Sequence, residues 1–212
     1  DTDALGRDLA FFNATNDSRT AANLKPGSGF GLVDAEIVVQ EPRRVGLTLF
    51  GDNAGRDEVG RNRLGAIFNV RSVFGWSDPL TVSATAADGT SAGSIGYSLP
   101  VTTWGTRLGV QYDSSAIDVR RGPFTALDIT GTSSSASAQL TQPLVAEQQR
   151  RANFFVGYAN KDSITRFGDV PTTRADTRNL LMGFDGQGIS ASTFWFLRGA
   201  FGIGTTSWGG DR

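Results

Sequence analysis

The stretch Leu80–Ala86, which reads LTVSATA, has an apolar residue at every second position and threonine or serine between them. This period of two is typical of a β-strand with one apolar and one polar face. The polar face carries small hydroxylated side chains, which suit the wall of a water-filled channel as well as a surface in bulk solvent. The pattern therefore predicts a strand of a closed antiparallel membrane barrel, or else a strand of a soluble β-sandwich.

The same alternation recurs along most of the chain, in about nine segments. The expected strands span residues 44–51, 62–70, 79–88, 92–101, 104–114, 125–142, 151–162, 176–186 and 192–206. One parity is apolar in most of them and includes Leu47, Leu64, Val82, Leu108 and Phe154. The other parity carries Arg63, Asn69, Ser94, Ser98, Arg107, Gln111, Asp113, Asp128, Thr130 and Asn153. A charge facing lipid costs about 2–4 kcal/mol at the bilayer midplane, so this segregation of charges favours the barrel.

Composition excludes several classes of function. The chain has 212 residues with 20 basic and 21 acidic side chains and no long basic tract, so we expect no nucleic-acid partner. It has no cysteine and no histidine, which excludes disulfides, thiol catalysis, the Ser-His-Asp triad and metal sites built on either residue. We therefore predict no catalytic residue, no metal and no cofactor. All basic residues except Lys25 and Lys161 are arginine, which suits a polar lumen, although genomic bias gives the same composition.

The connections and termini add three further expectations. There is no apolar run of about 18 residues, so we expect no helical membrane span. The chain begins without a signal peptide, which for an exported protein indicates a mature or truncated sequence. Short connections near Ser77–Pro79 and Leu99–Val101 alternate with long polar ones at 52–61, 114–124 and 163–175, as in outer-membrane barrels. Aromatic residues near the expected strand ends suit interfacial girdles: Phe74, Trp76, Tyr97, Trp104, Tyr112, Tyr158, Trp195 and Trp208.

Residues 1–43 follow a different pattern and form a separate unit. Apolar residues between Ala4 and Phe12 recur at helical spacing. Two strands are expected at Arg19–Leu24 and Leu32–Gln40, separated by a turn that contains Pro26 and Gly27. Glu41–Arg44 contains a proline and is the expected linker to the first long strand.

Six motifs, in sequence order, resemble those of one family. Asp52, Asn53 and Gly55, followed by Gly60 and Arg61, resemble the turn that opens the barrel of two-partner-secretion transporters, the haemolysin-activator branch of the Omp85 superfamily. The other matching segments are 24–34, 74–80, 97–109, 131–145 and 152–163. The likeness covers nearly the whole chain.

The resemblance implies both a fold and a function. Residues 1–43 would be the end of a periplasmic POTRA module, and residues 44–212 the N-terminal half of a transmembrane β-barrel. The protein would be a monomeric pore in the bacterial outer membrane, surrounded by lipid, that passively exports a large exoprotein recognised through its N-terminal secretion domain. The POTRA hairpin would bind this partner by strand addition near Arg19, Leu24, Val33 and Glu36, unless it only packs against its own helix. Arg63, Arg107, Gln111, Asp113, Asp128 and Asn153 would face the lumen, either to serve transport or to pair with one another across strands.

The sequence departs from the family pattern in two places. Barrels of this family have about sixteen strands, so the nine expected here cannot close a channel-sized lumen alone. The family's Val-Arg-Gly-aromatic loop is also missing, since Leu197–Phe201 imitates it only inside an expected strand. The chain is therefore interpreted as an internal piece of the transporter.

Three alternatives remain open at this point. The first is an Omp85-type insertase of outer-membrane proteins. The second is a soluble sandwich that binds carbohydrate through Trp76, Trp104, Trp195 or Trp208. The third is a glycosidase whose two carboxylates come from Asp113, Asp118, Asp128, Asp162 or Asp185.

Overall fold

The computed structural model describes residues 2–16, 18–29 and 31–204, and strands dominate this part of the chain. The first elements are α1 (Thr2–Thr15), β1 (Arg19–Pro26) and β2 (Val33–Gln40). Nine further strands and two short 3₁₀ helices follow: β3 (Val45–Asp52), η1 (Asp57–Val59), β4 (Arg63–Val70), β5 (Leu80–Ala87), β6 (Thr90–Pro100), β7 (Arg107–Asp118), η2 (Thr125–Leu127), β8 (Ile129–Ala146), β9 (Arg150–Phe167), β10 (Val170–Ile189) and β11 (Phe194–Gly204). The described part has no helix that is both long and apolar enough to cross a membrane.

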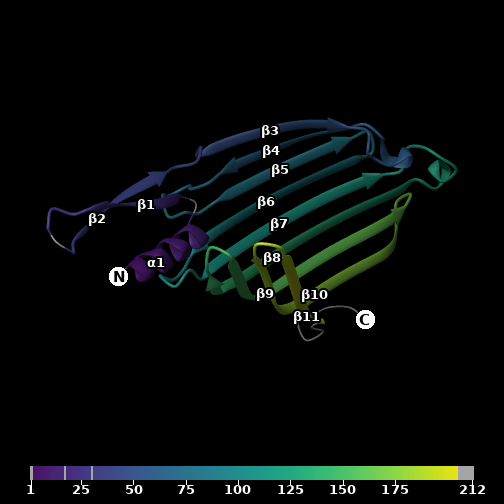
Figure 1. Cartoon of the computed structure of the whole chain (residues 1–212). Coiled ribbons are helices and arrows are strands. Elements are labelled where there is room, and N and C mark those ends of the chain that lie inside the picture. The colour runs from purple at the N-terminus through teal and green to yellow at the C-terminus, as the bar shows by residue number, and fades with distance from the viewer. Residues whose placement is uncertain (1, 17, 30, 205–212) are drawn as a thin grey trace.

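Strands β3 to β11 form one nine-stranded antiparallel sheet in which every strand pairs with its neighbours in sequence. The sheet curves like part of a cylinder wall (Figure 1). Within the described residues β3 and β11 are its two edges, so this wall is open. We call the end where β3 leaves the β1–β2 hairpin the hairpin end, and the opposite end the far end.

Cross-strand register sorts the side chains onto two faces, because residues directly opposite each other in antiparallel strands share a face. Leu47 lies opposite Phe68, Phe68 opposite Val82, and Val82 opposite Ile95. We call this the apolar face. No second layer of the described chain buries its side chains: Leu47 is 64% exposed and Leu64 is 72% exposed. Ala10 and Phe155 are the only buried apolar residues that the structure describes, so a sandwich, which needs a core between two sheets, is excluded.

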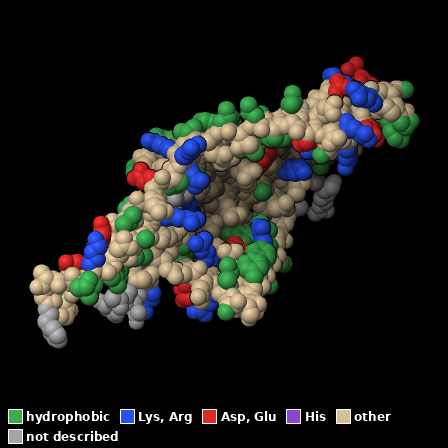
Figure 2. Space-filling model, turned by 45° about the horizontal axis from the view of Figure 1, so that its top comes forward, with side chains coloured by type: hydrophobic (Ala, Val, Ile, Leu, Met, Phe, Trp, Pro, Cys, Tyr) green, Lys and Arg blue, Asp and Glu red, His purple; other side chains and the backbone are tan. Residues whose placement is uncertain are grey.

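The opposite face, the polar face, lines the hollow side of the curved sheet. In Figure 2 this hollow is mostly tan, the colour of hydroxyl, amide and backbone atoms, with scattered blue and red side chains. Serine and threonine occur on this face from β5 to β10, for example in the directly paired row Ser83, Ser94, Asp113, Ser135, Lys161 and Thr177. Thr130 is an exception to the expected parity, because it pairs with Asp118 on the other face.

The connections differ from the expected pattern. The long polar loop expected at 163–175 is wrong: β9 and β10 run on to a two-residue turn at Gly168 and Asp169, with a bulge between Pro171 and Thr173. At the far end, long connections at 53–62 and 119–128 alternate with two-residue turns at 88–89 and 168–169. The alternation of short and long loops therefore occurs along one end of the sheet rather than between its two ends.

The aromatic residues near strand ends lie mostly at the hairpin end. Phe74, Trp76 and Trp104 belong to the β4–β5 and β6–β7 connections and are 70%, 65% and 75% exposed. Trp195 is the second residue of β11, and this strand begins at the hairpin end. Trp208, and the last two residues of the expected strand 192–206, lie outside the described residues.

Candidate functional site

The middle of the polar face is a wall of hydroxyl groups around one carboxylate. The hydroxyls of Ser83 and Ser94 are 2.7 Å apart across β5 and β6. Asp113 accepts hydrogen bonds from the Gln111 amide at 2.9 and 3.1 Å and from the Ser135 hydroxyl at 3.3 Å. An open hollow of about 390 Å³ is lined by Ser83, Ser94, Asp113 and Ser135 together with Lys161. Such a surface offers exchangeable hydrogen bonds and few apolar contacts to a chain that passes over it.

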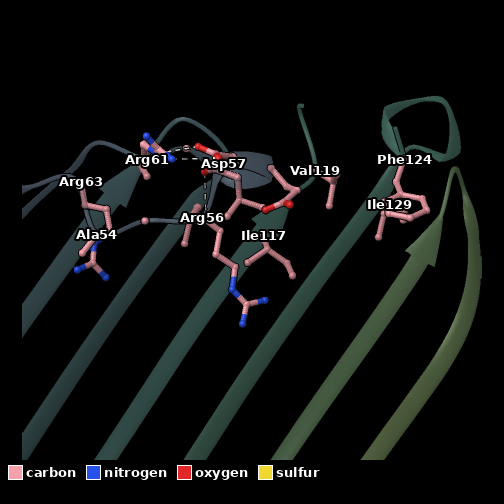
Figure 3. Close-up of a pocket in the computed structure, with 15 residues that line it drawn as sticks. Ala54, Arg56, Asp57, Arg61, Arg63, Ile117, Val119, Phe124 and Ile129 are labelled. Carbon is pink, nitrogen blue, oxygen red and sulfur yellow. Dashed lines mark hydrogen bonds and ion pairs between the residues drawn. The ribbon is translucent and has the colours of Figure 1, made fainter. Parts of the chain in front are cut away.

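The expected opening turn, Asp52 to Arg61, forms a roof over the far end of the polar face (Figure 3). Asp52 accepts two hydrogen bonds from the Arg63 guanidinium across the strand pair, at 2.8 and 3.0 Å, and one from the Ala54 amide at 2.9 Å. The Gly55 amide donates to the Arg61 carbonyl at 2.9 Å. A Cβ on Gly55 would collide with the Gly60 carbonyl, which explains why this position in the turn needs glycine.

This roof is tied to the neighbouring connections by backbone bonds. The Val59 carbonyl accepts from the Gly89 amide at 2.8 Å, and the Glu58 carbonyl accepts from the Arg120 amide at 2.9 Å. An open cavity of about 980 Å³ lies below, lined by Arg56, Arg63 and apolar side chains such as Ile117 and Phe124. The Arg56 guanidinium extends down from the roof toward the strands (Figure 3).

Arg107 joins three elements at the hairpin end of the polar face. Its guanidinium donates to the Ser98 hydroxyl at 3.1 Å, to the Ser77 carbonyl at 2.6 Å and to the Thr15 carbonyl at 3.2 Å. Thr15 is the last residue of α1, where unpaired carbonyls give the helix end a partial negative charge. The cation therefore satisfies a helix terminus while it holds α1 against the rim of the sheet.

Close packing strengthens this contact between α1 and the rim. Gly105 has φ +79°, and a Cβ there would come within 2.6 Å of Thr15 Cγ2 and 3.0 Å of Pro143 Cγ. Phe11 lies against the same glycine, and the Ser77 hydroxyl is 3.3 Å from the Asn16 side-chain oxygen. Asn13 in turn bonds to the Thr20 amide and carbonyl, so β1 is connected through α1 to the rim.

Asp78 organises the β4–β5 connection at the same end. Its side chain is fully buried and accepts from the amides of Phe74 and Trp76, the Ser72 hydroxyl and the Tyr97 hydroxyl, at 2.9–3.2 Å. Burial alone would raise the pKa of Asp78, but these donors stabilise the carboxylate and hold its pKa well below the ordinary value. The bonds fix the turn that exposes Phe74 and Trp76.

The remaining polar candidates have separate environments. Asn153 donates to Asp185 across β9 and β10 at 2.9 Å, and the neighbouring Arg198 guanidinium lies 5.7 Å from the centroid of the buried Phe155 ring. Asp128 does not lie on the strand wall: it follows η2 in the 119–128 connection with φ 46°, one residue before β8 begins. No two of the five carboxylates considered for a glycosidase are cross-strand partners.

The hairpin residues expected to bind a partner fall on different faces. Leu24 and Val33 share one face, where they are 48% and 57% exposed. Arg19 and Glu36 lie on the other, and Glu36 forms an ion pair with Lys25 at 2.6 Å. Within the described residues β1 pairs only with β2, so each strand has an open edge.

Sequence reasoning missed Asp78, Ser77 and Thr15. Asp78 follows serine and precedes proline, shortly after Phe74 and Trp76, which is a usable signal for an aspartate that accepts bonds from turn amides. The contact between Arg107 and Thr15 joins residues 92 positions apart and has no local signature.

Comparison with known proteins gives the family. The model for the haemolysin secretion/activation protein ShlB/FhaC/HecB matches residues 31–212. Among solved structures, CdiB from Escherichia coli has a TM-score of 0.79 at 16% identity, with 96% of this chain and 39% of that chain covered. CdiB from Acinetobacter baumannii has a TM-score of 0.64 at 18% identity, covering 87% and 38%.

A third similar structure is BamA from Haemophilus ducreyi lacking POTRA domains 1–3, with a TM-score of 0.52 at 11% identity, covering 98% of this chain and 42% of that chain. No curated protein gives a significant match. The chain spans about two fifths of the length of these structures, and at these identities they show the fold alone. Because the family model covers most of its length, the chain belongs to the haemolysin secretion/activation protein family of ShlB, FhaC and HecB.

Proposed function

We propose that this chain forms part of the wall of an outer-membrane pore that exports a large partner protein. The family is that of the two-partner-secretion transporters, and its solved relatives are β-barrels. The observation that carries the proposal is the separation of the two faces: exposed aliphatic side chains on the apolar face and hydroxyl groups on the hollow polar face. The first suits lipid and the second suits a watery passage.

Under this proposal the hairpin end lies in the periplasm and the far end at the cell surface. Residues 1–43 would form the end of a POTRA module, and residues 44–212 would form the first half of a monomeric barrel. The exported protein would add a strand of its N-terminal secretion domain to an open edge of the β1–β2 hairpin. The exposed Leu24 and Val33 would then contact its apolar side chains, and Arg19 and Glu36 its polar ones.

Four polar side chains would keep the lumen wall hydrated: Arg63, Gln111, Asp113 and Asn153. Arg107 would lie at the periplasmic opening of the lumen. All five have hydrogen-bond partners in the protein, so their proposed role is to shape the surface rather than to hold the substrate tightly. Asp128 would lie at the surface exit instead. Transport would be passive, because no glycine-rich loop with the Lys-Ser/Thr of a nucleotide site is present in the sequence.

Two neighbouring substitutions on β5 test which face meets lipid. Val82→Arg places a charge on the apolar face, where lipid contact would cost about 2–4 kcal/mol, and we expect loss of assembled barrel in outer-membrane fractions. Ser83→Arg places the same charge on the polar face, and we expect normal assembly with altered single-channel conductance. Equal assembly of the two variants of the intact transporter would contradict the proposal.

An insertase of outer-membrane proteins is the second candidate, favoured by the likeness to BamA. Deletion of the gene separates the two functions. We expect one large exoprotein to disappear from the medium while other outer-membrane barrels keep their levels. A general fall in outer-membrane barrels would instead support the insertase.

A further inference from the structure

The apolar face changes character near the far ends of β9 and β10. Tyr158 and Leu180 are cross-strand partners and are the last apolar pair on these strands. Beyond them the same face carries Asn160 opposite Arg178, Asp162 opposite Asp176, and Ile164 opposite Arg174, with Arg166 one step further. We call Arg178, Arg174 and Arg166 the arginine ladder. Three arginines thus occur on the face that carries mostly apolar residues toward the hairpin end.

Of the three arginines in the ladder, only Arg178 forms an ion pair with another described residue. Arg178 bonds to Asp176 at 3.2 Å, and both side chains are largely covered, at 24% and 16% exposure. Neither Arg174 nor Arg166 forms an ion pair with any residue that the structure describes. Their neighbours across β9 are Thr132, opposite Ile164, and Thr130, opposite Arg166, which offer hydroxyl groups and no negative charge. Asp162 lies nearby on the same face. On this part of β9 and β10, the three arginines of the ladder therefore outnumber the two aspartates, Asp162 and Asp176.

The height of the ladder above the lipid follows from strand geometry. A strand rises about 3.3 Å per residue, and a tilt near 45° converts this to about 2.3 Å along the membrane normal. Arg178 then lies about 5 Å beyond Leu180, within a headgroup zone about 5–8 Å thick. Arg174 lies about 14 Å beyond Leu180 and Arg166 about 19 Å beyond Tyr158, which is above the reach of a simple phospholipid headgroup.

We propose that the arginine ladder binds the phosphate groups of a phosphorylated glycolipid of the outer leaflet, a lipopolysaccharide, including phosphates on its core sugars. This inference rests on the proposed function, in which the apolar face meets lipid and the far end lies at the cell surface. A guanidinium pairs with phosphate through two parallel hydrogen bonds, which suits arginine better than lysine for this role. Asp176 holds Arg178 in place at the headgroup level, and Arg174 and Arg166 remain available to the sugars above.

A binding titration of the intact transporter in detergent tests the ladder. The probes are lipid A alone, lipopolysaccharide with a phosphorylated inner core, and the same molecule with its core phosphates removed. We expect the phosphorylated core to improve affinity about tenfold over lipid A, as two charged hydrogen-bonding contacts allow. Removal of the core phosphates should abolish this gain, as should the double variant Arg166→Gln/Arg174→Gln. The affinity for lipid A alone should stay unchanged.

Matched variants control for charge and folding. Lys161→Gln/Arg151→Gln removes two positive charges from the polar face of the same strand β9 and should keep the gain. Arg166→Lys/Arg174→Lys keeps the charges and should keep part of it. The proposal is overturned if wild-type protein shows no gain from the core phosphates, if the Gln/Gln variant retains it, or if the polar-face control loses it equally. Such a failure leaves the contrast between Val82→Arg and Ser83→Arg intact, whereas failure of that contrast removes both proposals.

Discussion

Replacement of Arg107 by alanine should release α1 from the rim of the barrel. The guanidinium provides the charged bond to the Thr15 carbonyl, at 3.2 Å, that links the helix to the strands. A hydrogen bond to a charged group contributes about 1.5–3 kcal/mol, and the length of this one places it in the lower half, about 1.5–2 kcal/mol. A change of about 1.4 kcal/mol alters an equilibrium tenfold, so undocked α1 should become roughly 10–30 times more populated.

Thiol labelling measures this population, because this chain has no cysteine. Ala10 is buried on α1 with 9% exposure, so an Ala10→Cys substitution provides a small probe that reacts only when the helix moves away. We expect maleimide to label it about 10–30 times faster in the Arg107→Ala background, by the same conversion. Arg107→Lys should fall between, since one ammonium cannot reach three acceptors in the fixed geometry of a guanidinium.

The control is Arg63→Ala, which removes an arginine at the far end and should leave labelling at the parent rate. A rate in Arg107→Ala within about twofold of the parent would refute the docking role, since it corresponds to less than about 0.5 kcal/mol. The same variant should also change conductance or export, because α1 sits at the proposed periplasmic mouth. Wild-type conductance and export together with fast labelling would confine Arg107 to a structural role.

Two further predictions concern the connections. Asp78→Asn should destabilise the protein by about 2–4 kcal/mol, because an amide NH₂ would face groups that can only donate, and a lower urea midpoint in lipid vesicles would show it. Because the folded state lowers the pKa of Asp78, the carboxylate contributes fully to the free energy of unfolding above the unfolded carboxyl pKa of about 3.9. This contribution is lost as the pH falls through the lower pKa of the folded state. A wild-type urea midpoint that already drops between about pH 6 and 5 would therefore not come from Asp78. Gly60→Ala should loosen the roof, since φ is +104° and a Cβ would approach the Asp88 amide nitrogen to 2.6 Å; faster proteolysis at 53–62 is expected, with Gly46→Ala, which has nothing within 4 Å of an added Cβ, as the silent control.

Most of the sheet was predictable because its two faces carry side chains of opposite character at alternate residues. The period of two located all nine strands of the large sheet, and the apolar parity that includes Leu47, Val82 and Phe154 is exposed on one face. This signal depends only on local sequence. It fails where the apolar face becomes polar, beyond Tyr158 and Leu180.

Residues 163–175 show that failure. There the apolar face carries Arg166 and Arg174, so the stretch resembles a polar loop although β9 and β10 continue through it. Asp128 was misplaced for a related reason: its neighbours alternate, but the backbone turns at this residue with φ 46°.

The site at the hairpin end needed information that alternation does not contain. Arg107 was expected on the polar face from its parity, and its register with Pro100 agrees. Its partners are backbone carbonyls of Thr15 and Ser77, which any residue type would supply. Asp78 differs, because three of its four partners lie within six residues of it and its position between Ser77 and Pro79 is a local signal. The contacts of Arg107 depend on how distant segments meet and leave no pattern in the sequence.

The near absence of buried apolar side chains has a consequence for biogenesis. With only Ala10 and Phe155 buried among the described aliphatic and aromatic residues, the native sheet gains little hydrophobic free energy while it stays in water. Under the proposed function, folding and insertion are one event, and the acyl chains take the place of a protein interior. We then expect the chain to need a chaperone before that event, and laboratory refolding to succeed only when micelles or vesicles are present from the first step.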